Sequence, residues 1–305
     1  MPMNREWVRA VEWPTVALAL GCQTAWLVLA FAGEGLHPAI WVVLVGLLTT
    51  LYWSLVHEAV HLHPTRNPLF NRALVWLPIG WVYSYGRFRD THLEHHATGA
   101  LTDPFDDPES WYLSGNDWLR TTRLERAVLT FNNTLLGRLT IGPLIVMWRM
   151  IVGDASIMLR GGASGRHVAR DWLQHLPGVA LLATALVLWS GIPAWQFVAA
   201  TYLGIAILLI RTFLEHQASE HAGERTVIIE DRGILAFLFL FNNLHVVHHT
   251  RPGLAWYRLP GFYRRHRQQF IRRNRGYVYP SYGAVFLRHF LTPKEPVPHP
   301  DSRLV

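Results

Sequence analysis

Long apolar runs constrain this chain most, because about 18 or more consecutive apolar residues have the length of a membrane span. Four runs meet that criterion: residues 14–32, 38–56, 172–189 and 192–214. The first two runs, and likewise the last two, are joined by a short link without Lys or Arg, whereas basic residues flank the pairs. Under the positive-inside rule this pattern predicts two helical hairpins that begin and end in the cytoplasm.

The chain has 17 histidines, and the spacing of several of them is informative. His57 and His61 lie four residues apart. Two further groups share the spacing i, i+3, i+4, namely His92, His95 and His96, and His245, His248 and His249. Positions three and four apart lie on one face of a helix, so each group can direct several imidazoles towards one place.

These groups predict a site for two metal ions. Imidazole nitrogen suits zinc, copper, iron and nickel. The eight or nine histidines in question exceed what one ion accepts, since a zinc site takes about four ligands in all. Iron is the natural candidate for a histidine-rich dinuclear site with room for dioxygen. Isolated histidines elsewhere are interpreted as packed or surface residues: His37, His63, His167, His175, His266, His289 and His299.

Two shorter apolar stretches, Leu69–Val82 and Leu139–Val152, contain charged side chains and are too short for a span. If either crossed alone, the histidine groups would lie on opposite sides of the membrane, so we place both stretches at the interface. The predicted fold is all-α: an integral membrane protein with four transmembrane helices in two hairpins, plus cytoplasmic and interfacial helices that carry the histidines. Residues 1–292 form one domain, and residues 293–305 form a flexible, proline-rich C-terminal tail.

Two other classes of protein remain open on these residues. Residues 57–61 fit the H-E-x-x-H motif of zinc proteases, in which Glu58 would be the general base, but a protease leaves both histidine triples unexplained. A metal transporter places its ligands near the middle of the bilayer, whereas the histidine groups lie outside the four apolar runs. The net charge of +7 is densest in residues 264–275, which indicates a cytoplasmic surface that attracts lipid headgroups rather than a nucleic-acid site.

The three histidine groups resemble the boxes of the membrane fatty acid desaturase and hydroxylase superfamily. Its HxxxH, HxxHH and HxxHH boxes are matched by residues 57–61, 92–96 and 245–249. The order of the boxes relative to the paired spans also matches, so the resemblance covers roughly residues 14–275. It implies a non-haem centre of two Fe2+ ions, with O2 as co-substrate, that oxidises an unactivated C–H bond of a lipid.

The resemblance also implies one more histidine ligand just after the last span. His216 is the expected ninth ligand, and His221 is the alternative. The family's desaturases can also hold an iron through water on an asparagine, for which Asn242 and Asn243 are the candidates. No catalytic group separate from the metal ligands is expected.

Ligating histidines usually donate their second ring N–H to a carboxylate or a carbonyl. The carboxylates close enough in sequence to accept it are Glu58, Asp90, Glu94 and Glu215. The acidic stretch 103–109 follows the second box closely, and we interpret it as a proline-rigid turn rather than as a direct metal ligand.

By resemblance, the expected reaction introduces a double bond into a fatty acyl or related lipid chain. Hydroxylation or ketone formation on an alkane, lipid or terpenoid is the alternative. The sequence has no flavin- or nicotinamide-binding motif and only one cysteine, so the electrons are expected from a separate donor such as a ferredoxin, a rubredoxin or a cytochrome. The expected location is the plasma (inner) membrane, with the metal site on the cytoplasmic side and no nucleic-acid partner.

Overall fold

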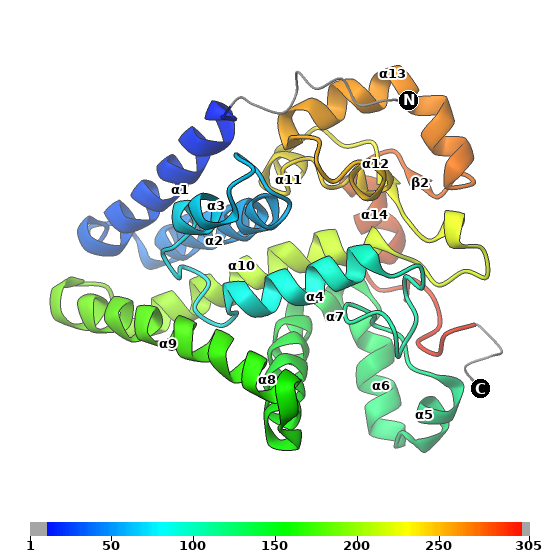
Figure 1. Ribbon diagram of the computed structural model, residues 1–305, viewed down its shortest axis with the longest axis horizontal. Coiled ribbons are helices and arrows are strands. Elements are labelled where there is room, and N and C mark those ends of the chain that lie inside the picture. Colours follow the sequence, from blue (N-terminus) through cyan, green and yellow to red (C-terminus); the bar gives the residue numbers. More distant parts are fainter. Residues whose placement is uncertain (1–10, 301–305) are drawn as a thin grey trace.

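The two pairs of apolar runs form two helical hairpins in the computed structural model, which describes residues 11–300 (Figure 1). The first hairpin is α1 (Trp13–Ala32) and α2 (Pro38–Val60), and the second is α9 (Gly162–Trp189) and α10 (Ala194–Glu215). A proline stands in the first turn of both α1 and α2, where a helix leaves its N–H groups unpaired in any case. The expected hairpin pairs are therefore present as helices.

The tips of the two hairpins lie side by side, at the left of Figure 1. The Ser190 hydroxyl donates to the carbonyl oxygen of Ala30 at 2.5 Å, and a Cβ atom added at Gly191 would meet the side chain of Glu34. Both links that lack Lys and Arg therefore lie at one end of the molecule. The opposite ends of α2 and α10 carry histidines.

Small residues let α2 and α10 pack closely. The Thr50 hydroxyl donates across the interface to the carbonyl oxygen of Gly204 at 3.0 Å. A Cβ atom at Gly204 would lie 2.8 Å from the side chain of Thr49 and 3.0 Å from the carbonyl oxygen of Gly46. Glycine is therefore required for this approach of the two backbones, as is common between membrane helices.

Gly204→Ala is expected to destabilise the protein, because the added methyl group overpacks this interface at a cost of about 1–3 kcal/mol. Gly21→Ala in α1 is the matched control, since nothing lies within 4 Å of a Cβ atom at that position. Alanine is also the better helix former there by about 1 kcal/mol. The midpoint of thermal unfolding in detergent should fall by several degrees for Gly204→Ala only, and equal midpoints for the two variants would contradict the close packing.

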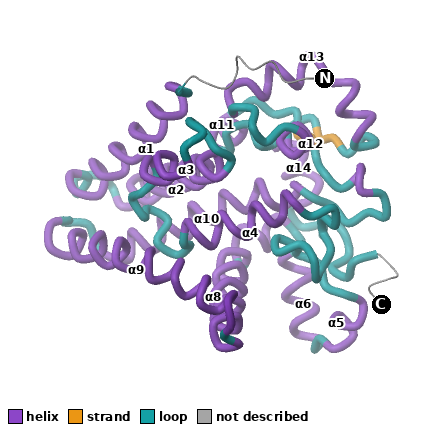
Figure 2. Tube along the Cα trace, in the orientation of Figure 1, coloured by secondary structure: helices purple, strands orange, loops and turns teal. Residues whose placement is uncertain are grey.

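Shorter helices surround the histidine-bearing ends of the hairpins (Figure 2). In the sequence between the two hairpins come α3 (Pro68–Leu74), α4 (Tyr85–Ala97), α5 (Gly115–Arg120), α6 (Arg123–Asn132), α7 (Leu135–Thr140) and α8 (Gly142–Arg160). After α10 come a 3-10 turn (Ala222–Glu224), α11 (Ile234–Leu238), α12 (His245–Thr250), another 3-10 turn (Trp256–Arg258), α13 (Leu259–Arg273) and α14 (Tyr282–His289). The mainly helical fold is confirmed, with one small addition: β1 (Ile228–Ile229) pairs in parallel with β2 (Val278–Tyr279).

The helix α8 differs from the expectation for Leu139–Val152. That stretch was too short for a span, but the structure continues the helix to Arg160, which gives α8 a length of 19 residues. Five helices in residues 11–300, α8 among them, are thus long and apolar enough to cross a membrane. The polar residues 162–171 likewise belong to a helix, because α9 begins ten positions before its apolar run and reaches 28 residues.

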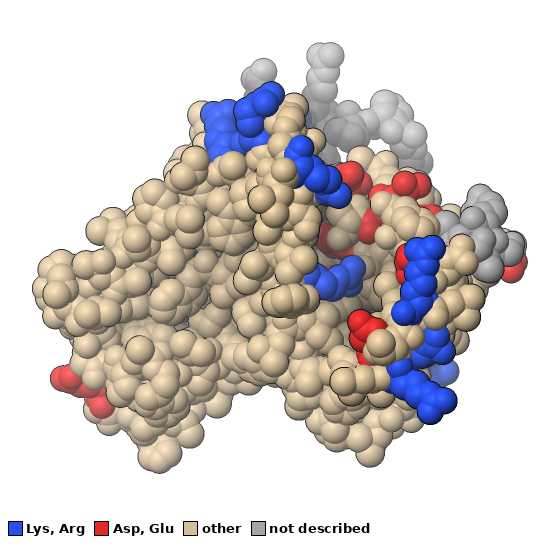
Figure 3. Space-filling model, turned by 90° about the horizontal axis from the view of Figure 1, so that it is seen from below, with Lys and Arg blue, Asp and Glu red and all other residues tan. Residues whose placement is uncertain are grey.

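Charged side chains are unevenly distributed over the surface. Figure 3 shows one face of the molecule, on which the left part, formed by the hairpins, carries few Lys, Arg, Asp or Glu side chains. Large apolar residues of the hairpins are exposed, for example Val187 at 82% and Trp189 at 71%. Large exposed apolar side chains on a surface with few charges are unfavourable in water and favourable in lipid.

Residues 293–300, expected as the start of a flexible tail, are packed against the domain. The Lys294 ammonium donates to the carbonyl oxygen of His216 at 2.6 Å. The Leu113 N–H donates to the carbonyl oxygen of Val297 at 3.2 Å, and the His299 N–H donates to that of Leu113 at 2.8 Å. The proline content that indicated disorder is thus compatible with an extended, hydrogen-bonded segment, and residues 301–305 lie outside the described residues.

Candidate metal centre

Nine histidines meet in two groups at the ends of α2 and α10. The first group holds His57, His61, His92, His96 and His248, and the second holds His95, His216, His245 and His249. Within each group the candidate ligand nitrogens lie within 4.8 Å of one another. The structure thus brings all three boxes and the histidine after the last span to one place.

Helices and helix ends position these rings. His57 lies in the last turn of α2, and His61 is the residue at which that helix ends. His216 occupies the same position at the end of α10. The second box lies on α4, which starts where the Ser84 hydroxyl accepts the N–H of Arg87, and the third box lies on α12. Seven of the nine rings therefore belong to helices and the other two to helix ends, and such elements hold ligands more precisely than loops do.

The second box is divided between the two groups, because i, i+3 and i+4 fan out over one helical face. His92 and His96 face the first group, whereas His95 faces the second. Five pairs of Nε2 atoms lie 3.0–3.1 Å apart: His61 and His92, His96 and His248, His95 and His216, His216 and His245, and His245 and His249.

The acidic stretch after the second box holds two of its rings by their Nδ1 atoms. The His92 Nδ1 lies 2.9 Å from an oxygen of Glu109, and the His95 Nδ1 lies 2.8 Å from an oxygen of Asp107. Sequence reasoning interpreted this stretch only as a rigid turn and missed both roles. The available signal was the position of two carboxylates within 17 residues of the histidines that they orient.

Neutral oxygens hold two rings of the second group. The His216 Nδ1 donates to the carbonyl oxygen of Arg225 at 3.3 Å, and the His245 Nδ1 donates to the side-chain oxygen of Asn242 at 3.0 Å. An oxygen of Glu215 lies 3.6 Å from the same His245 nitrogen and also accepts from Asn242 at 3.4 Å. Asn242 therefore orients a histidine, and its amide is in turn held by Glu215.

The hydrogen bonds at Nδ1 determine which nitrogen of each ring faces the group. In His95, His216 and His245, Nδ1 bonds to an oxygen that only accepts, so Nδ1 carries the proton and Nε2 carries a lone pair. Lone pairs 3.1 Å apart repel unless a cation lies between them. A second proton, on the Nε2 of His95, would remove the repulsion between His95 and His216. The repulsion between the lone pairs of His216 and His245 would remain. The donor set therefore fits a metal ion.

Burial keeps most of these rings neutral. It lowers the pKa of His216 and His248 well below the usual range, and neighbouring histidines act in the same direction. His95 is the exception: burial alone would lower its pKa, but Glu109 and Asp107 outweigh burial and raise the pKa to about 9. Neutral imidazole is the form that binds metal, so most of the rings are already in the binding form at neutral pH.

The other residues singled out in the sequence lie at varied distances from the two groups. An oxygen of Glu58 lies 3.8 Å from the Nδ1 of His57, and the Glu58 carboxylate accepts the N–H of Trp256 at 3.3 Å. Asp90 pairs instead with Arg89 and His167, and Glu94 is exposed. His221 is exposed and joins neither group, and the Asn243 amide bonds to the carbonyl oxygens of residues 229 and 231.

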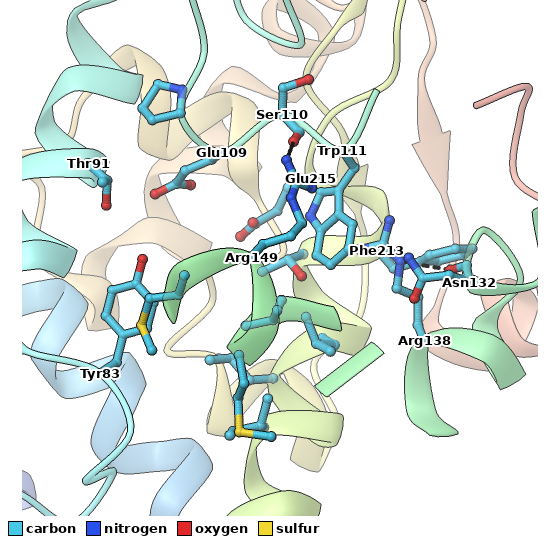
Figure 4. Close-up of a pocket in the computed structure, with 18 of the residues that line it drawn as sticks. Tyr83, Thr91, Glu109, Ser110, Trp111, Asn132, Arg138, Arg149, Phe213 and Glu215 are labelled. Carbon is cyan, nitrogen blue, oxygen red and sulfur yellow. Dashed lines mark hydrogen bonds between the residues drawn. The ribbon is translucent and has the colours of Figure 1, made fainter. Parts of the chain in front are cut away.

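A cavity of about 440 Å3 lies beside the metal centre. Glu109, Glu215 and His216 line the cavity next to the histidines, and Figure 4 shows Glu109 and Glu215 there. Apolar side chains of α8 and α10, such as Met150 and Leu209, line much of the remainder. A cavity of this size is typical of a small-molecule site, in which apolar walls enclose the ligand and a few polar groups orient it.

The fold and the two histidine groups define a membrane protein with a candidate dinuclear metal centre. The family model of the fatty acid desaturases matches residues 35–281, which is more than half of the 305-residue chain and includes all three boxes. The chain therefore belongs to the fatty acid desaturase family, as the resemblance of its boxes implied. A comparison with curated proteins finds no match.

Proposed function

We propose that this protein is an O2-dependent membrane oxidoreductase with two iron ions, which introduces a double bond into a fatty acyl or related lipid chain. A hydroxylase or ketolase reaction on an alkane, lipid or terpenoid is the alternative on the same scaffold. The observation that carries the proposal is the contact between His216 and His245, whose Nε2 lone pairs face each other 3.1 Å apart in the second group. Bound iron would supply the activation of O2 for C–H oxidation.

Each of the two histidine groups would bind one of the two iron ions. Five histidines of the first group would hold one iron, and four of the second, with His216 as the ninth ligand, would hold the other. Asp107 and Glu109 keep the rings of His95 and His92 oriented through Nδ1. The apolar walls of the cavity would bind the lipid chain and exclude water from the reacting carbon.

Electrons would come from a separate donor such as a ferredoxin, a rubredoxin or a cytochrome, because the chain has a single cysteine and so cannot ligate an iron–sulfur cluster with thiolates. The helix α13 packs beside the histidine-bearing α12 and exposes several arginines. That surface is suited to attract an acidic donor protein or anionic headgroups.

We place four crossings in the bilayer, with α8 at the interface and the metal centre on the cytoplasmic side of the plasma (inner) membrane. In α7, just before α8, the Leu136 N–H donates to the carbonyl oxygen of Phe290 at 3.0 Å. In α9, just after α8, His167 bonds to Asp90 of α4 at 2.5 Å. These bonds connect both ends of α8 to segments near the histidines, which supports an interfacial helix over a single crossing.

The zinc protease alternative is weakened by two observations. His57 and His61 belong to a group of five histidines, more than a single zinc ion accepts. The Glu58 carboxylate, the general base of the protease motif, is buried and accepts the N–H of Trp256.

The proposal is tested by metal analysis and iron spectroscopy of the protein purified in detergent. About two irons per chain are expected, and His95→Ala and His248→Ala, one from each group, should each lower that content. Lipid extracts of expressing cells should then contain a new double bond, or a new hydroxyl group under the alternative. One zinc per chain, dependent on His57 and indifferent to His95 and His248, would contradict the proposal and favour the protease.

A further inference from the structure

Two arginines line the cavity without an acidic partner. Arg138 of α7 is 3% exposed, and Arg149 of α8 reaches the cavity from the opposite side of Trp111 (Figure 4). Within residues 11–300, neither guanidinium forms an ion pair with Asp or Glu. Two neighbouring cations in a largely apolar site are costly unless an anion joins them.

The surroundings of Arg138 hold its guanidinium in place and leave part of it unused. Its Nε donates to the carbonyl oxygen of Asn132 at 2.9 Å, and its guanidinium carbon lies 3.5 Å from the ring centre of Trp111. Its Nη1 is buried and has no hydrogen-bond partner among the described residues. Burial lowers the pKa of Arg138 to about 9, with Arg149 acting in the same direction, so the group is still charged at neutral pH.

Arg149 faces the same indole ring. Its guanidinium carbon lies 5.4 Å from the Trp111 ring centre, and one of its nitrogens donates to the carbonyl oxygen of Ser110 at 2.9 Å. A carbonyl oxygen is neutral and leaves the positive charge uncompensated. This end of the cavity therefore holds two uncompensated positive charges and, on Arg138, a buried donor without a partner within the described part of the chain.

The other charged side chains around the cavity are compensated. Their partners lie 2.7–2.9 Å away: Arg87 with Asp154, Arg211 with Glu215, Lys294 with Glu295, Asp107 with His95, and Glu109 with His92. Glu295 is thus already paired, although its charge also acts on Arg138. The contrast singles out Arg138 and Arg149 as the cations that lack an anion.

We propose that Arg138 and Arg149 bind the anionic end of the substrate, a compact carboxylate or phosphate group on a single apolar chain. This inference rests on the proposed function and specifies its substrate class. The planar fork of arginine suits both oxyanions, since it donates two parallel hydrogen bonds. The chain would then lie along the apolar side chains of α8 and α10, past Glu215 and His216. A neutral hydrocarbon would leave both arginines uncompensated.

The test measures binding by calorimetry in a neutral detergent, with dodecanoate, dodecyl phosphate and dodecanol as probes of equal chain length. Wild-type protein should bind at least one of the anions about tenfold or more tightly than the alcohol. Arg138→Gln and Arg149→Gln should each remove most of that preference and leave the affinity for dodecanol nearly unchanged. Arg120→Gln is the control, because Arg120 lies outside the cavity and its side chain is 82% exposed.

The results separate this inference from the proposed function. Arg138→Lys keeps the charge and should retain part of the preference, which distinguishes a lost charge from a misfolded variant. The stronger of the two anions identifies the head group. Equal affinity of the wild type for anions and alcohol, or equal weakening of all probes in both glutamine variants, would overturn the inference. Iron content is a separate readout: failure to bind iron with intact anion preference would contradict the proposed function alone.

Discussion

His216→Ala is expected to leave about one iron per chain in place of about two and to abolish lipid oxidation. His216 is one of four histidines in the second group, and its Nε2 lies 3.1 Å from those of both His95 and His245. Its removal leaves three imidazoles, while the five-histidine group stays complete. Iron analysis and the iron spectrum would report the loss, and product analysis would report the activity.

His221→Ala is the matched control, because this histidine follows the same span five positions later and was the alternative ligand. It is exposed and belongs to neither group, so full iron content and normal activity are expected. If His221→Ala lost an iron and His216→Ala did not, the assignment of the ninth ligand would have to be reversed.

Asp107→Asn is expected to weaken iron binding about 10- to 100-fold, as is usual when the acceptor behind a ligating histidine is changed. The Asp107 carboxylate is buried, and one of its oxygens lies 2.8 Å from the Nδ1 of His95. Asparagine keeps the shape but replaces the charge with an amide, which can present an N–H instead of an acceptor. Retention of iron during dialysis against a chelator would measure the effect.

Asp106→Asn provides the comparison within the same turn. Asp106 is exposed, so its change leaves the histidines untouched and should retain iron as the wild type does. Equal iron loss in the two variants would show that the turn acts through its overall charge, and not through the bond to His95.

The length of the apolar runs made much of this architecture predictable. Apolar runs of span length identify α1, α2, α9 and α10, because their outer surface must be apolar along its whole length to face lipid. The interruption of residues 139–160 by charged side chains concealed the length of α8. Arg149 donates to a carbonyl oxygen and Asp154 pairs with Arg87, so both side chains have hydrogen-bond partners and the helix continues through them. Such long-range partners are invisible in local composition.

In the candidate site, too, the spacing within one helix was predictable from the sequence, whereas contacts between distant segments were not. Spacing places His92, His95 and His96 on one face of α4, but it cannot say that His95 faces a different group from its neighbours. That division depends on where α10 ends and on where α12 lies. Likewise, chain proximity favoured Asp90 and Glu94 as partners of the second box, whereas the structure uses more distant carboxylates that a turn folds back onto the rings.

The segment at residues 293–300 has a consequence for how the chain can be handled. Lys294 bonds to the backbone of His216, and the Lys294 N–H donates to the carbonyl oxygen of Asn133. A truncation at residue 292, where composition alone would set the domain boundary, would therefore remove one of the bonds that hold the end of α10 and its candidate ligand His216. Affinity tags and fusion partners should follow a linker, so that residues 293–300 keep these contacts with the domain.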